Sequence, residues 1–208
     1  MSIDIIYEDN YLLAVNKSPN IPVTPNNPGD KNLTDRLNAF LADRGDTYKA
    51  HPCHRLDRET SGVTLFAKGK KAQKAMMAVF EQHEIQKFYI ALVRGSLAKA
   101  DGDIMTPING KTAHTEYHVI AQREGYAIVH IRLHTGRTNQ IRIHFASIGH
   151  PLLGETKFAY RRDFNIKFRR TALHCETLEF RSPFTMQNVI ITANLPDDIR
   201  FMIESDDK

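Results

Sequence analysis

The chain has 208 residues, 41% hydrophobic and 25% charged, which is the composition of an ordinary globular protein with a sizeable core. Its net charge of +4, its pI of about 9.0 and its ten histidines favour an anionic partner. No apolar run approaches the roughly 18 residues that cross a bilayer, and the acidic segment Met1–Asp9 is unlike a signal peptide. Two cysteines are too few for a disulfide framework, so we expect free thiols. Together these features predict no membrane association and a cytoplasmic location.

Short runs rich in β-branched and aromatic residues predict about eight strands. They are Ile3–Tyr7, Tyr11–Val15, Val63–Ala67, Phe88–Val93, Thr115–Ile120, Ala127–Leu133, Leu173–Phe180 and Val189–Ala193. Helical spacing of apolar residues predicts helices at Leu33–Ala42, Lys71–Gln82, Thr138–Ile148 and Asp197–Ile203. Because strands outnumber helices and often follow one another directly, we expect an α+β fold with a mixed, largely antiparallel sheet and flanking helices. No linker or repeat divides the chain, which predicts one domain over residues 1–208.

Positive charge is concentrated in two clusters where a phosphate backbone could lie. The first comprises Lys68, Lys70, Lys71 and Lys74, and the second comprises Arg161, Arg162, Lys167, Arg169 and Arg170. The second falls in the polar stretch Lys157–Arg170, which also carries four aromatic residues. Two interpretations stay open for this stretch: a loop that touches RNA, or a surface excursion that packs its own aromatic side chains.

The first motif is the stretch His54–Gly62, which holds Asp57 between Arg55 and Arg58 and leads into the apolar run Val63–Ala67. Glycine and small hydroxyl residues allow a tight turn at the mouth of a strand. Adjacent guanidinium groups would keep a catalytic carboxylate ionised. A salt-bridged surface turn is the alternative interpretation.

The second motif is Lys87–Gly95, in which Tyr89 lies inside a predicted strand. An isolated tyrosine there is normally a core residue with its hydroxyl group at the rim. The third motif is Leu133–His144, where Thr138 or Asn139 is expected to cap a helix. An arginine beside the apolar stripe of such a helix, as Arg142 is, is expected to be ion-paired.

These segments resemble the RluA family of RNA pseudouridine synthases. The first matches its pattern H-R-L-D-x-x-T-S-G at every fixed position, and the second matches K-x-Y-x-A-x-V-x-G at all five. The third matches T-G-R-x-H-Q-[IL]-R-x-H except that Asn139 replaces the usual histidine. Glu8–Lys17 and the segment from Leu173 to Pro183 resemble the opening and closing motifs of the family. Because the first match begins at residue 8, we expect a minimal catalytic domain without the S4-type RNA-binding module.

The resemblance implies a role for each matched residue. Asp57 is the essential carboxylate, either as a nucleophile or as a base in a glycal-type route. Arg142 pairs with it, and Tyr89 stacks on the target base and takes part in removing the C5 proton. Arg55 enters the space left by the flipped base or holds its phosphate. Further RNA contacts are expected from Arg58, Lys87, Arg137, Arg161, Arg162, Arg169 and Arg170.

The implied function is an isomerase that detaches a uracil from its ribose and rejoins it through C5, without a metal or other cofactor. The uridine must be flipped from its stack, so we expect a stem-loop of ribosomal or transfer RNA as substrate, with no obligatory protein partner and a monomeric enzyme. One alternative is a non-catalytic RNA-binding or remodelling module. Another is a hydrolase or nuclease that uses Asp57 with a histidine, although no Ser or Cys nucleophile motif or zinc-ligand spacing accompanies it.

Overall fold

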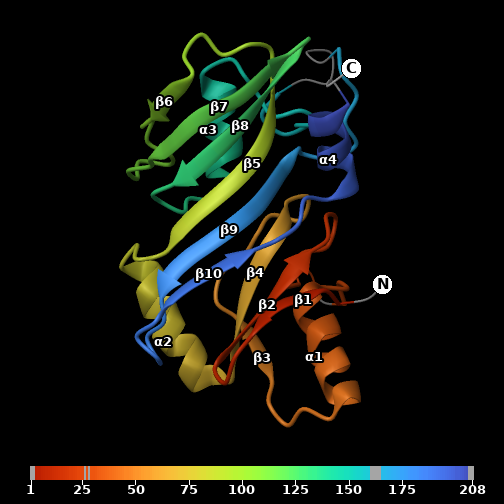
Figure 1. The fold of residues 1–208 in the computed structure, drawn as a ribbon, viewed down its shortest axis with the longest axis vertical. Coiled ribbons are helices and arrows are strands. Elements are labelled where there is room, and N and C mark those ends of the chain that lie inside the picture. The colour runs from red at the N-terminus through yellow and green to blue at the C-terminus, as the bar shows by residue number, and fades with distance from the viewer. Residues whose placement is uncertain (1–2, 26, 28, 160–164, 206–208) are drawn as a thin grey trace. The chain divides into compact units, whose positions relative to one another are not determined.

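The computed structural model describes residues 3–25, 27, 29–159 and 165–205, which form two compact units. Unit 1 comprises Met1–Ile85 and Glu176–Asn194, and unit 2 comprises Gln86–Cys175 and Leu195–Lys208. The chain therefore passes from one unit to the other three times along its length (Figure 1). The expected single domain over residues 1–208 stays a prediction.

The strands are β1 (Ile5–Glu8), β2 (Leu12–Lys17), β3 (Ala50–Pro52), β4 (Ser61–Lys68), β5 (Gln86–Arg94), β6 (Asp101–Ile104), β7 (Thr115–Arg123), β8 (Tyr126–Leu133), β9 (Leu173–Arg181) and β10 (Asn188–Thr192). The helices are α1 (Leu33–Arg44), α2 (Lys70–Glu81), α3 (Gln140–Ser147) and α4 (Asp197–Glu204). Over the part of the chain that the structure describes, no helix combines the length and the apolar character that a membrane span requires.

In unit 1, strands β1, β2 and β4 lie side by side and antiparallel, β3 pairs with β4, and β10 pairs with the second half of β9. Strand β4 is buried from Ser61 to Ala67, so side chains on both of its faces lie in the core. Helix α1 begins where the Asn32 side chain accepts a hydrogen bond from Asp35 N–H, and it ends at Gly45 in the left-handed conformation. These strands and helices frame the turn that carries Asp57.

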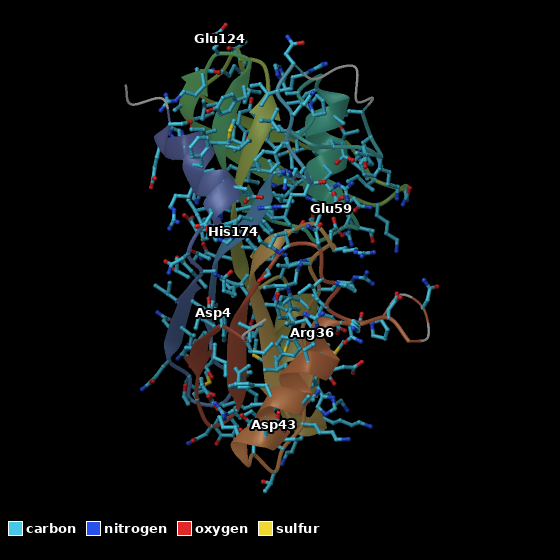
Figure 2. All side chains as sticks on the ribbon, turned by 90° about the vertical axis from the view of Figure 1, so that its right-hand side faces the viewer. Asp4, Arg36, Asp43, Glu59, Glu124 and His174 are labelled. Carbon is cyan, nitrogen blue, oxygen red and sulfur yellow. The ribbon has the colours of Figure 1, made fainter. Side chains whose placement is uncertain are left out.

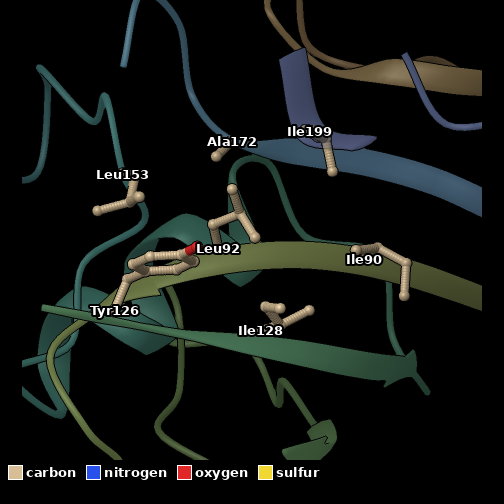
Figure 3. Packing of buried hydrophobic residues seen from close by; sticks show 7 residues of the cluster. All are labelled: Ile90, Leu92, Tyr126, Ile128, Leu153, Ala172 and Ile199. Carbon is tan, nitrogen blue, oxygen red and sulfur yellow. The ribbon is translucent and has the colours of Figure 1, made fainter. Parts of the chain in front are cut away.

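In unit 2, the antiparallel strands follow the order β5, β8, β7 and β6. One face of this sheet packs against α4 in the cluster of Figure 3, formed by Ile90, Leu92, Tyr126, Ile128, Leu153, Ala172 and Ile199. Side chains alternate between the two faces of a strand, so Tyr89 and Tyr117 lie on the opposite face. There the Tyr117 ring contacts Phe145 of α3, with ring centroids 5.5 Å apart. The sheet is therefore covered by α4 on one face and by α3 on the other.

All eight predicted strands and all four predicted helices have counterparts, and the α+β class with antiparallel pairing is confirmed. The sequence patterns missed β3 and β6, which are only three and four residues long. In the stretch Lys157–Arg170, Ile166 and Phe168 pack against the cluster of Figure 3, which favours a packed excursion for its described ends. Residues 160–164, with Arg161 and Arg162, lie outside the described residues.

Candidate active site

Asp57 lies half-buried in the turn that leads into β4. The Thr60 N–H group donates to the Asp57 carbonyl oxygen at 3.1 Å and closes the turn, and the Thr60 side chain is buried. Gly62 has a φ of 111°, a conformation that residues with a Cβ rarely adopt, so the strand entry requires glycine here. Figure 2 labels Glu59, which lies in the same turn. The aspartate is therefore presented by an ordered turn at the mouth of a buried strand, as the sequence predicted.

Lys17, at the end of β2, anchors this turn through its backbone. Its side chain is fully buried, and its ammonium group donates to the carbonyl oxygens of Ser18 at 3.1 Å, Ile21 at 2.8 Å and Arg58 at 3.1 Å. A buried charge is tolerated only where its hydrogen-bonding capacity is met, and three acceptors match the three N–H groups of lysine. Lys17 thereby joins the segment after β2 to the residue that follows Asp57.

His54 fixes the other end of the turn. Its Nε2 atom accepts a hydrogen bond from Leu65 N–H at 3.0 Å, which requires that nitrogen to be unprotonated. Its ring stacks on Phe80 of α2, with centroids 5.1 Å apart. The histidine therefore ties the turn to the strand and helix that follow.

Replacing Lys17 by methionine is expected to lower the free energy of unfolding by about 2 kcal/mol, because three carbonyl groups lose their donor while the volume of the side chain is nearly kept. Urea unfolding measures this change. Lys49→Met, which removes an exposed lysine from the same unit, serves as the control and should alter stability little. Equal stabilities of the Lys17→Met and Lys49→Met proteins would contradict the anchoring role.

Tyr89 lies in the middle of β5, only 7% exposed and opposite Ile131 of β8. Lys87 precedes it by two residues, so the two side chains point to the same face of the sheet. This is the face that α3 covers through the contact of Phe145 with Tyr117. The second and third motifs therefore meet on one face of unit 2.

Asn139 of the third motif differs from what the sequence predicted. It occupies the N-cap position of α3, but in the left-handed conformation with φ 55°, and its side chain makes no capping hydrogen bond. Of the two residues predicted to cap this helix, Thr138 and Asn139, the second occupies the cap position, but the predicted side-chain capping bond is not formed. Instead its Oδ1 atom accepts a hydrogen bond from Arg142 Nη1 at 3.0 Å. The residue that replaces the family's histidine thus helps to orient the arginine.

Arg142 forms a buried, bidentate ion pair with Glu155. Its Nε donates to Glu155 Oε2 at 2.7 Å and its Nη2 to Oε1 at 2.8 Å, and its guanidinium group lies over the Phe158 ring. Oε1 also accepts from the backbone N–H groups of residues 156 to 158. Burial would raise the pKa of the Glu155 carboxyl group, but the hydrogen bonds from Arg142 and the backbone outweigh it and lower the pKa. The arginine is therefore held in one orientation by a fully ionised partner.

A second buried network supports α3 from β7. Gln140 Nε2 donates to the Thr115 hydroxyl group at 3.0 Å, and that hydroxyl lies 2.9 Å from His144 Nδ1. His144 Nε2 lies 2.9 Å from the Thr106 carbonyl oxygen, which can only accept, so the proton of the ring is on Nε2. Burial lowers the pKa of His144, which keeps the ring neutral. Gln140 and His144 therefore serve the structure of the third motif.

The predicted RNA contacts fall into different settings. Arg55, Arg58 and Arg169 are exposed, whereas Lys87 and Arg137 are half-buried. Arg170 is 2% exposed and forms a bidentate ion pair with Asp198 of α4, through Nε at 2.7 Å and Nη2 at 2.9 Å. Arg170 was predicted to contact RNA, and this prediction is corrected because its guanidinium group is buried and ion-paired within unit 2. The basic run in the sequence could not reveal a partner 28 residues away.

The sequence did not predict the roles of two residues in this arrangement. Lys17 is the last residue of the opening motif, but that motif did not indicate that its side chain is buried and holds the Asp57 turn. Glu155 stands 13 residues after Arg142 and after a turn, so no helical or strand spacing connects the two. Asp57 belongs to unit 1 and Arg142 to unit 2, and their expected pairing stays a prediction.

Known proteins match both the sequence and the fold. The family model described as RNA pseudouridylate synthase matches residues 11–147. The uncharacterized RNA pseudouridine synthase YhcT of Bacillus subtilis is 33% identical over 95% of this chain and 70% of its own. The ribosomal large subunit pseudouridine synthase D of Nitrosomonas europaea is 33% identical over 97% of this chain and 64% of its own.

A solved structure, human RNA pseudouridylate synthase domain containing 4, superposes with a TM-score of 0.79 over 95% of this chain and 90% of its own. At 22% identity this likeness shows the fold alone. Fold and motifs together define an RNA-modifying isomerase. The chain belongs to the RNA pseudouridine synthase family, and its relatives of the synthase D type confirm the resemblance to the RluA branch.

Proposed function

We propose that this pseudouridine synthase isomerises a specific uridine in a structured loop of ribosomal or transfer RNA, with Asp57 as the essential carboxylate. The observation that carries the proposal is the ordered turn that presents Asp57, half-buried, at the entry of β4 within the family match. The similarity to a ribosomal large subunit synthase supports ribosomal RNA as the first substrate to test. We also propose that residues 1–208 act as one catalytic domain, as a monomer, without a protein partner.

In this proposal the uridine is flipped out of its stack, which takes a few kcal/mol and is easiest in a loop. Asp57 then attacks the nucleoside or removes a proton in a glycal-type route. Tyr89 stacks on the base and takes part in removing the C5 proton, and Arg142 keeps the aspartate ionised. Arg55 is exposed and fits a role in filling the vacated space or holding the phosphate. Asp57, Tyr89 and Arg142 are all present at their motif positions, which disfavours a non-catalytic RNA-binding module.

The direct test is to incubate the purified chain with ribosomal and transfer RNA from a strain that lacks its gene, and to map pseudouridines by sequencing. We expect a new pseudouridine at one or a few loop positions that are modified in the parent strain. The proposal would be refuted if the protein restored none of the pseudouridines that the RNA of the deletion strain lacks. Size-exclusion chromatography with light scattering tests the monomer.

RNA affinity is expected to fall steeply with salt, because it depends on exposed basic residues that replace counterions on phosphates. Between roughly 50 and 200 mM salt, the dissociation constant should rise at least about tenfold. Arg169→Glu should weaken binding to all RNAs alike, whereas Lys99→Glu, an exposed change far from both basic clusters in sequence, serves as the comparison. A dissociation constant that does not change with salt would contradict the electrostatic contribution.

A further inference from the structure

Lys87 is a half-buried lysine whose ammonium group has no hydrogen bond or ion pair with any residue in the described part of the chain. Burial lowers the pKa of this group, the Cys175 thiol opposes that effect, and the charge of Arg137 reinforces it. A buried cation normally has an anionic partner or several acceptors, as Lys17 does. Lys87 therefore has the environment of a binding residue whose partner is supplied from outside the chain.

Arg137 is the second cation at this place. Its backbone N–H group donates to Gln140 Oε1 at 3.0 Å, and its side-chain Nε donates to the Thr112 carbonyl oxygen at 2.9 Å. These bonds fix the side chain, while its two terminal amino groups bind no acceptor among the described residues. Among the described residues, no carboxylate forms an ion pair with Arg137 or Lys87. Two like charges held together in a half-buried setting repel each other, and an anion between them would remove that repulsion.

Gly136 supplies room for such an anion. A Cβ atom built on Gly136 would lie 3.6 Å from Lys87 Nζ, so the missing side chain leaves space next to the ammonium group. Gly136 itself is exposed, so this space is open to solvent. A guanidinium fork and a lysine point charge are the usual partners of a phosphate group. The chemistry of the three residues therefore suits one phosphate.

We propose that Lys87, Gly136 and Arg137 form a binding site for a single phosphate group of the RNA, that of the nucleotide whose base meets Tyr89. Lys87 and Tyr89 point to the same face of β5, about 7 Å apart along the strand, so base and phosphate of one nucleotide would be held by one strand. The inference rests on the proposed function. It assigns these residues to positioning the target nucleotide, in contrast to the diffuse attraction that exposed lysines and arginines provide.

The test compares uridine 5′-monophosphate with uridine as ligands of the full chain, by calorimetric titration at low salt. Wild-type protein is expected to bind the monophosphate at least about tenfold more tightly than the nucleoside, which is the usual scale of one charge-assisted contact. Lys87→Met and Arg137→Gln should lose this preference. Lys99→Met, which removes an exposed lysine of the same unit, should keep it.

Gly136→Ala separates the geometry of the site from its charge. The added methyl group would make an ordinary contact with Lys87 Nζ at 3.6 Å, so the fold should tolerate it while the space for the phosphate is filled. We expect this variant to unfold at the wild-type temperature and to lose the preference for the monophosphate. Because both cations remain, a loss of binding in this variant cannot come from net charge.

Two results would overturn the inference. One is equal affinity of the wild type for the monophosphate and the nucleoside, including binding of both too weak to measure at about 10 mM. The other is a full preference for the monophosphate in the Lys87→Met protein. A failure of the proposed function would look different, because the phosphate preference would be present while no RNA gains a pseudouridine.

Discussion

Asp57→Asn is expected to abolish pseudouridine formation while leaving the protein folded and able to bind RNA. The amide keeps the size and much of the hydrogen bonding of the carboxylate, but it lacks the negative charge that either proposed route requires. The side chain is half-buried in a turn whose order comes from Lys17, His54 and Thr60, so the fold should survive. RNA affinity should stay the same or rise slightly, because one negative charge facing a polyanion is removed.

Release of tritium from RNA labelled at C5 of uridine measures the isomerisation directly. A rate below about a thousandth of the wild type, a loss of over ~4 kcal/mol in transition-state stabilisation, is expected. Glu59→Gln makes the same chemical change two residues away in the same turn and should retain activity. If Asp57→Asn releases tritium faster than that limit, or if Glu59→Gln is equally inactive, Asp57 is not the essential carboxylate.

Arg142→Lys should also be severely impaired, by at least about a hundredfold in turnover, because lysine keeps the charge but loses the planar fork. In the structure that fork binds both oxygens of Glu155 and the Asn139 side chain. The lysine donors radiate from a single atom and cannot match the planar spread of these acceptors, so the orientation of the charge would be lost. Breaking this buried pair from the other side, by Glu155→Ala, should lower the free energy of unfolding by roughly 3 to 5 kcal/mol.

Turnover of the Arg142→Lys protein should be measured with urea unfolding of the same preparation, so that a loss of activity is not confused with a loss of fold. Arg200→Lys provides a matched control, because Arg200 is an exposed arginine of unit 2 whose partner, Asp197, lies on the surface. Turnover near that of the wild type in the Arg142→Lys protein would remove Arg142 from the reaction.

The sequence was sufficient for the parts of the fold that depend on local patterns. The turn before β4, the placement of Tyr89 inside β5 and the helix that carries Arg142 were all predicted from short stretches. Each follows from the alternation of apolar residues or from turn-forming residues next to a motif. Strand β6 was missed because the segment Asp101–Ile104 has only one apolar residue and gains its strand conformation by pairing with β7.

Properties that depend on partners distant in sequence could not be predicted. A basic run looks the same whether its residues meet phosphate or an internal carboxylate, and only the fold shows that Arg170 binds Asp198. The same holds for Arg142, whose predicted need for a partner was correct but whose partner Glu155 carried no signal. Thr138 or Asn139 was expected to cap the helix, yet Asn139 has a left-handed backbone and its side chain accepts a hydrogen bond from Arg142 instead.

The three passages of the chain between the units have a consequence for biosynthesis. Unit 1 receives β10 and the second half of β9 from residues 176–194, and the core of unit 2 includes Ile199, which is fully buried. During synthesis from the N-terminus, neither core can therefore be completed until residues 176–199 have emerged from the ribosome. Until then the strand edge and apolar surfaces that these late segments cover stay open, a state in which nascent chains aggregate. We expect chains truncated at residue 175 to be insoluble, and the nascent protein to rely on chaperones until α4 is made.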